Sequence, residues 1–244
     1  MSASAMMDRR TEVSPRSLAR MAGVCQLLEA ITATLGQVIV LGRLIVSGNA
    51  PATAANIVQH ERLYWCGFAS SVVAVLFHVA WAFLMYELLK PVNRRVSIFA
   101  VLVMLMGCAM LAVTGLLYIA PLIVLQGPGS LSAFTAAQLQ ALAAAFLRLN
   151  AYAFDIHTVF FGVWCVLTGY LIFKSTFLPK VMGILLIVSG LGWMLYLSPP
   201  FAAPLFPFIA AASAIGEVPL EFWLIVVGLN EARWKEQAMG GLTT

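Results

Sequence analysis

The stretch that decides the fold runs from Leu63 to Val96 and reads LYWCGFASSVVAVLFHVAWAFLMYELLKPVNRRV. It holds a long apolar run, then a proline, an asparagine and two arginines. A continuous run of about 20 apolar residues fits a transmembrane helix, because the hydrocarbon core of a bilayer is about 30 Å thick. A barrel strand would instead alternate apolar and polar residues over about ten positions. The stretch therefore predicts a helix that crosses a membrane and turns back at residues 91–95.

Outside this stretch the chain is equally apolar. It is 62% hydrophobic and 10% charged, with a mean hydropathy of +0.95, whereas soluble domains carry roughly a quarter charged residues. We therefore expect an all-α, polytopic membrane protein with one six-helix domain at 19–235 and polar cytoplasmic tails at 1–18 and 236–244. The predicted spans cover about residues 18–41, 63–89, 96–125, 151–173, 177–197 and 206–229.

The positions of the basic residues predict the orientation. Only Arg43, Arg62 and Arg148 fall on one side of this layout. Short loops rich in Lys and Arg stay in the cytoplasm, so both termini are expected there. The net charge of +4 does not indicate nucleic acid, because these charges sit at helix ends, where they meet lipid head groups. The other eleven are Arg9, Arg10, Arg16, Arg20, Lys90, Arg94, Arg95, Lys174, Lys180, Arg233 and Lys235.

Two segments predict further features of the bundle. Residues 132–147 repeat apolar side chains at near-helical spacing and lack charge, which favours a short interfacial helix on the outer face. In the fifth span, Gly183, Gly190 and Gly192 offer small surfaces on which a neighbouring helix can pack closely.

Ionisable side chains inside the spans are the candidate functional groups. Each costs a few kcal/mol to place in a bilayer and usually faces the bundle interior. Several aromatic side chains could line a cavity around these groups. The catalytic candidates are Glu217, His78 and Asp155, and the ligand-binding candidates are Glu29, Glu221, His157, Trp81 and Trp164.

Depth along each helix sorts these candidates. A rise of about 1.5 Å per residue places Glu29, His78 and Glu217 near the midplane. Asp155 and His157 should lie in the outer third, because they come early in the fourth span. Asp155 could then act at the site, cap the outer end of that span or pair with Arg148.

No Lys or Arg lies deep enough to neutralise the midplane acids, so each is expected to be a neutral, hydrogen-bonded group. His78 is the natural partner for one of them. A carboxyl that only fixes helix register by hydrogen bonding is the structural alternative.

The same positions argue against a cofactor. Zinc catalysis needs three protein ligands on one ion. Asp155 and His157 are two residues apart, about 200° around a helix, and so cannot both face one ion. A haem between His78 and His157 is disfavoured because the two are expected at different depths. We therefore expect no cofactor and no metal.

Two functions remain in view. The first is a small-molecule- or proton-linked membrane binder or accessory protein that uses buried carboxylates. The second is an intramembrane enzyme that acts on a lipid or isoprenoid by acid–base chemistry at Glu217, with His78 or Asp155 as partner. The enzyme requires these three side chains to converge on one cavity. The expected partners are membrane lipid and a hydrophobic small molecule, with a homo-oligomer or a scaffolding role as further options.

The order of several short motifs resembles a bacterial six-helix integral-membrane family known as domain of unknown function 4386. The resemblance covers about residues 17–234 and implies a multi-pass protein of a bacterial inner membrane, with no activity attached. It also implies that an acidic residue is common at the position of Glu217. The motifs are SLARMAG at 17–23, ELLKPVN at 87–93, FFG at 160–162, TGYLIFKS at 168–175, FLP at 177–179, and Glu217 with WLIVVGLN at 223–230.

Overall fold

The computed structural model describes residues 13–127 and 131–240 of the 244-residue chain. The described part is helical, and six of its helical segments are long and apolar enough to cross a membrane. This confirms the predicted all-α, six-span architecture. The parts of the predicted tails at residues 1–12 and 241–244 lie outside the described residues. The six segments are Pro15–Leu44, Glu61–Leu89, Arg94–Gln126, Ala136–Lys174, Lys180–Leu197 and Pro199–Val226.

The first span contains a change of helix type. Its helix α2 (Pro15–Ala33) starts where Ser14 Oγ accepts a hydrogen bond from the Ser17 amide at 3.2 Å. It continues as a π-helical segment, η1 (Thr34–Val40), and a last turn, α3 (Leu41–Leu44). Short π-helical segments are rare and are frequent at functional sites. A short helix, α4 (Ala50–Gln59), follows and is capped by the Asn49 side chain.

The predicted turn after the second span is confirmed. Helix α5 (Glu61–Leu89) and helix α6 (Arg94–Gln126) meet there. The Asn93 side chain accepts the Val96 amide at 3.1 Å, which caps α6. Helix α6 ends at Gln126, and the next residue, Gly127, has a φ of +42° that glycine readily adopts.

The prediction of a separate interfacial helix at 132–147 is wrong. Most of it forms the first part of one long helix, α7 (Ala136–Lys174), together with the predicted fourth span. Thr135 and Gln138 form a reciprocal capping box that starts α7, and no proline or glycine interrupts the helix before Gly162. With 39 residues, α7 is about 58 Å long, well beyond the hydrocarbon thickness.

The fifth span packs directly on α7. It consists of α8 (Lys180–Met194) and η3 (Leu195–Leu197). A Cβ on Gly183 would lie 2.5 Å from the Gly169 carbonyl oxygen, and one on Gly190 would lie 2.5 Å from that of Gly162. This confirms two of the three predicted small surfaces. At Gly192 a Cβ would meet nothing nearer than 3.6 Å.

The last part of the chain crosses back. Two short turns, α9 (Pro199–Ala202) and η4 (Ala203–Leu205), lead into helix α10 (Phe206–Val226), which contains Pro219. Helix α11 (Glu231–Gly240) follows a turn at Gly228. The Trp234 indole donates to the Leu88 carbonyl at 2.8 Å and holds α11 on the bundle.

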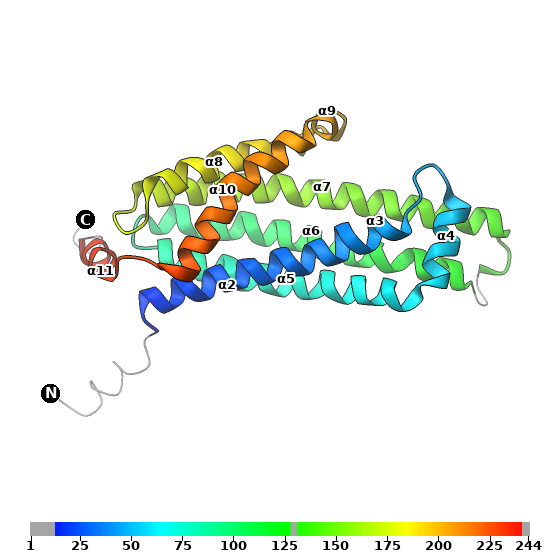
Figure 1. Cartoon of the computed structure of the whole chain (residues 1–244), viewed down its shortest axis with the longest axis horizontal. Helices are drawn as coiled ribbons and strands as arrows, with labels where there is room; N and C mark the ends of the chain where they lie inside the picture. The colour runs from blue at the N-terminus through cyan, green and yellow to red at the C-terminus, as the bar shows by residue number, and fades with distance from the viewer. Residues whose placement is uncertain (1–12, 128–130, 241–244) are drawn as a thin grey trace, which may run out of the picture.

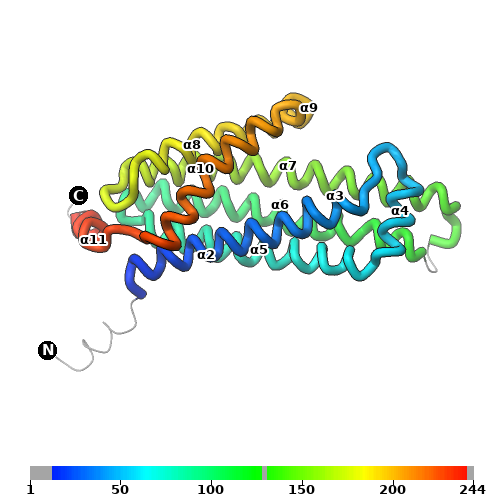
Figure 2. Tube along the Cα trace, viewed as in Figure 1, coloured from blue at the N-terminus to red at the C-terminus, as the bar shows by residue number. Residues whose placement is uncertain are grey.

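The bundle has two distinct ends. Helices α5, α6 and α7 form a long core beside the first span, while α8 and α10 lie over the part nearer α11 (Figure 1). The α5–α6 and α7–α8 turns lie at the same end as α11, called here the α11 end, and α4 marks the opposite, α4 end (Figure 2). The basic residues predicted on the terminal side lie at the α11 end, except that Arg9 and Arg10 fall outside the described residues.

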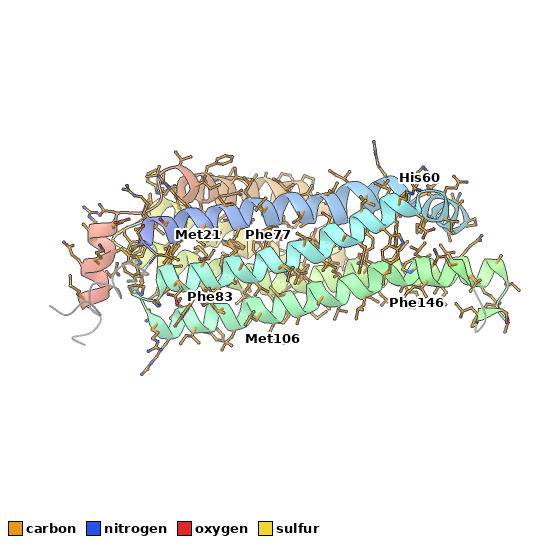
Figure 3. All side chains as sticks on the ribbon, turned by 90° about the horizontal axis from the view of Figure 1, so that it is seen from below. Met21, His60, Phe77, Phe83, Met106 and Phe146 are labelled. Atoms are coloured by element: carbon orange, nitrogen blue, oxygen red, sulfur yellow. The ribbon has the colours of Figure 1, made fainter. Side chains whose placement is uncertain are left out.

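Large apolar side chains cover the outer surface of the helices. Met21, Phe83 and Met106, on α2, α5 and α6, expose 48%, 59% and 57% of their surface (Figure 3). Exposed apolar surface on this scale indicates contact with lipid rather than water. The protein is therefore a multi-pass integral membrane protein, and its polar groups must be sought in the interior.

Candidate functional site

A buried acid–histidine pair lies between α2 and α5. His78 Nδ1 is 3.2 Å from Glu29 Oε1. The His78 side chain is 2% exposed and that of Glu29 is 16% exposed, so the pair is largely shielded from the surroundings. The other ring nitrogen of His78 lies 2.9 Å from Met104 Sδ on α6. The expectation that His78 partners one of the midplane acids is borne out by this contact.

His157 lies beside this pair, which corrects its predicted depth. The His157 and His78 ring centroids are 5.3 Å apart, so the two rings share one level of the bundle. The prediction of a shallower His157 counted from a span that begins at residue 151, whereas α7 begins at Ala136. The depth argument against a group bound between the two rings is therefore wrong. His157 Nδ1 lies 3.1 Å from the Gly107 carbonyl oxygen, which holds the ring against α6.

Glu217 has its own set of hydrogen bonds, between α8 and α10. Its Oε1 accepts a hydrogen bond from the Ser189 hydroxyl at 2.5 Å and another from the Trp193 indole at 2.9 Å. Ser189 is fully buried, and its hydroxyl also lies 3.4 Å from that of Ser213. Helices α8 and α10 approach closely here, since a Cβ on Gly216 would lie 2.6 Å from the Leu185 carbonyl oxygen.

Three buried polar atoms have no hydrogen-bond partner among the described residues. They are Gln26 Oε1, Trp81 Nε1 and Glu221 Oε1. Each lies about one helical turn nearer the α11 end than Glu29, His78 or Glu217 on the same helix. Buried polar atoms almost always have a partner in proteins. These three atoms thus leave buried hydrogen-bonding capacity at one level of the bundle, on the α11 side of Glu29, His78 and Glu217.

An aromatic cluster fills the space between the two carboxyl sites. The Phe161 ring is stacked on that of Trp164, with centroids 6.0 Å apart, and lies 5.8 Å from the His78 ring. Trp81 lies 4.5 Å from Trp164 by the same measure. Phe161 also contacts Trp193, the donor to Glu217, at 6.3 Å. Phe161 thus connects the Glu29–His78 pair with the Trp193 partner of Glu217, and Trp81 and Trp164 pack against Phe161 and each other.

Asp155 lies apart from these groups. It lines a groove of about 330 Å³ on the flank of α7, together with Tyr152, Tyr196 and Pro199. His157, two residues later, faces the interior instead. Asp155 does not cap a helix, since it lies in the middle of α7. Among the described residues Asp155 forms no ion pair with Arg148, and neither His78 nor Glu217 lines the groove that Asp155 lines.

A second polar layer lies about two turns nearer the α4 end. Gln37 Nε2 donates to Ser71 Oγ at 3.4 Å, and the Asn150 amide donates to the Thr114 carbonyl at 2.8 Å. Gln37, Ser71 and Asn150 are seven or eight residues from Glu29, His78 and His157 respectively, so the layers are roughly 10–12 Å apart. The π-helical segment η1 lies at this level.

The local geometry offers little for a metal. Within residues 13–127 and 131–240, no three His, Cys, Asp or Glu side chains lie close enough to hold an ion. In the same part of the chain, His78–Glu29 and Lys90–Glu87 are the ion pairs, and only the first is interior.

Several contributors to the site escaped the sequence reasoning. Met104 and Ser189 touch His78 and Glu217, yet neither residue type stands out in a membrane helix. Gln26 could have been predicted from the sequence, because an amide three residues before Glu29 lies on the same helix face as the carboxyl.

Comparisons with known proteins give a family but no activity. The family model described as "Domain of unknown function (DUF4386)" matches residues 21–228. An uncharacterized protein of Archaeoglobus fulgidus is 32% identical over 80 residues, which cover 30% of this chain and 45% of that protein. The chain thus matches less than half the length of this curated relative. No solved structure matches the chain.

Proposed function

We propose that this chain, which belongs to the DUF4386 family, is a proton-linked membrane protein. The proposal is based on the polar groups buried in its helix bundle. In this proposal Glu29 and His78 exchange a proton inside the bilayer. The observation that carries it is the 3.2 Å contact between His78 Nδ1 and Glu29 Oε1, in a part of the membrane where charged groups are costly and usually functional.

The chemistry of the pair supports proton exchange. The pair can hold its proton on the carboxyl or on the imidazole, and the two forms differ only by a transfer along one hydrogen bond. A purely structural pair would not need a histidine, since a hydroxyl or an amide can also bond a carboxyl.

Other polar groups supply steps on both sides of the pair. Towards the α4 end lies the layer around Gln37, Ser71 and Asn150. Towards the α11 end lie the unpartnered atoms of Gln26, Trp81 and Glu221. These levels are farther apart than one hydrogen bond, so bridging water molecules are part of the proposal. The basic α11 end is taken as the cytoplasmic face of a bacterial inner membrane.

A proton-flux experiment tests this function. The protein is reconstituted in liposomes that contain a pH indicator, and an inward pH gradient is imposed with a potassium–valinomycin potential. The wild type should admit protons faster than protein-free liposomes. Glu29→Gln and His78→Gln should lose most of this excess, because each removes a proton-exchanging group. Glu87→Gln is the matched control, since Glu87 pairs with Lys90 at the α11 end. Equal rates for the wild type and Glu29→Gln would contradict the proposal.

An intramembrane enzyme acting on a lipid or isoprenoid is the second candidate. Its supporting observation is the flank groove, where the Asp155 carboxyl lies among apolar and tyrosine side chains. Lipid analysis of protein purified as wild type, Asp155→Asn and Glu217→Gln tests it. A co-purifying isoprenoid or lipid lost in Asp155→Asn but kept in Glu217→Gln, whose carboxyl lies outside the groove, would favour this candidate, whereas identical ordinary phospholipid in all three would count against it.

A further inference from the structure

We propose that a pocket at the α11 end binds the phosphodiester head group of a membrane lipid through Arg16 and Arg233. The pocket has a volume of about 650 Å³ and lies between the start of α2, the α7–α8 turn and the α10–α11 turn. It is called the terminal pocket here. This site is independent of the proton-linked function, because it lies outside the membrane interior.

The Arg233 side chain is positioned by its neighbours. Its Nη1 donates to the Thr176 carbonyl at 3.3 Å. Thr176 is itself held against α11, since its amide and hydroxyl both donate to Gln237 Oε1, at 3.0 and 3.1 Å. A guanidinium has five N–H donors, so most of those of Arg233 remain for a ligand. Arg233 therefore lines the pocket as a cation that is tied to the α7–α8 turn by one hydrogen bond.

The aliphatic part of the Arg16 side chain packs against the α10–α11 turn at Gly228. The turn at Gly228 has φ of +76°, and a Cβ there would lie 2.9 Å from Arg16 Cγ. A glycine is thus needed for the aliphatic part of Arg16 to lie across the turn. The Arg16 guanidinium has no hydrogen-bond or ion-pair partner among the described residues. Planar guanidinium groups bind phosphate oxygens in a bidentate manner, which suits this free group to a phosphodiester.

The charge of the pocket fits such a ligand. Its charged lining residues are Arg16, Arg233 and Glu231, which leave one net positive charge. A phosphodiester carries one negative charge, which balances this net charge. The apolar side chains of Trp223 and Leu178 also line the pocket, so acyl chains could lie beside the head group. Its place at the ends of the spans is the depth at which lipid phosphates are found.

Native mass spectrometry of detergent-washed protein, titrated with phosphatidylglycerol or phosphatidylethanolamine, tests the site. The double variant Arg16→Gln/Arg233→Gln should bind either lipid roughly a hundredfold more weakly, because each of the two lost charged hydrogen bonds is worth about a factor of ten. The matched control, Arg94→Gln/Arg95→Gln, removes two exposed arginines at the same end that do not line the pocket, and should bind as the wild type does.

Each result decides the proposal. Equal weakening in the double variant and the control would show a general charge effect and overturn the site. Displacement of the lipid by millimolar inorganic phosphate would identify a free-anion site and overturn the lipid assignment. The melting temperature of each variant is measured alongside, and the single variants Arg16→Gln and Arg233→Gln replace the double variant if it unfolds. Loss of binding confined to the pocket variants supports the proposal.

Discussion

The substitution Gly183→Ala tests whether backbone contact between α7 and α8 sets the bundle. The added Cβ would lie 2.5 Å from the Gly169 carbonyl oxygen and 2.7 Å from the Phe173 nitrogen. Both are backbone atoms, so neither can rotate away, and the helices must separate by roughly 1 Å to restore ordinary contact. Such overpacking costs about 1–3 kcal/mol of unfolding free energy.

The matched control is Gly192→Ala, near the end of the same helix. A Cβ there would meet nothing nearer than Ile209 Cγ2 at 3.6 Å. Both substitutions gain about 1 kcal/mol in helix propensity, so their difference isolates the overpacking cost. At about 2–4 °C per kcal/mol, Gly183→Ala should melt roughly 2–12 °C below Gly192→Ala in detergent. Unfolding is followed by tryptophan fluorescence. Equal melting temperatures for the two variants would refute close backbone packing as the reason for a glycine at position 183.

Three further substitutions test individual contacts. Trp193→Phe removes a hydrogen-bond donor to Glu217. It should lower the free energy of unfolding by about 1.5–3 kcal/mol more than Trp81→Phe does, because the Trp81 indole N–H has no partner among the described residues. Equal melting temperatures for the two variants would contradict this. Thr135→Ala removes the cap of α7 and should cost about 1 kcal/mol, with faster amide exchange confined to the first turn; unchanged exchange there would rule out the cap. Tyr64→Phe removes the buried hydroxyl that donates to the Tyr118 carbonyl and should cost about 1 kcal/mol in thermal unfolding, so an unchanged stability would argue against this bond.

The six spans could be predicted because length and hydropathy fix them. The beginning of α7 could not be predicted in the same way. Residues 136–150 contain Gln138, Gln140, Arg148 and Asn150, which resemble a boundary on a hydropathy scale. Polar residues lower hydropathy without breaking a helix, however, and the segment has no proline or glycine. The capping box at Thr135 and Gln138 was the better signal for the start of the helix.

The contacts of the candidate site could be predicted only where the depth of two residues along their helices determines whether they meet. Glu29 and His78 lie at the same depth on sequential spans, and the structure places them in contact. His157 was misplaced because its depth was counted from the wrong helix start. The partners of Glu217 depend on how α10 is rotated against α8, which the close approach at Gly216 sets. A rotation of that kind leaves no trace in the pattern of a single apolar helix.

The central claim is that the Glu29 carboxyl gains and loses a proton next to His78. Infrared difference spectroscopy between two pH values measures this directly, because a protonated carboxyl has its own carbonyl stretching band. The account predicts such a band in the wild type, its loss in Glu29→Gln, a shift of the band in His78→Gln, and no change in the control Glu87→Gln. A wild-type spectrum that Glu29→Gln leaves unchanged would contradict the account.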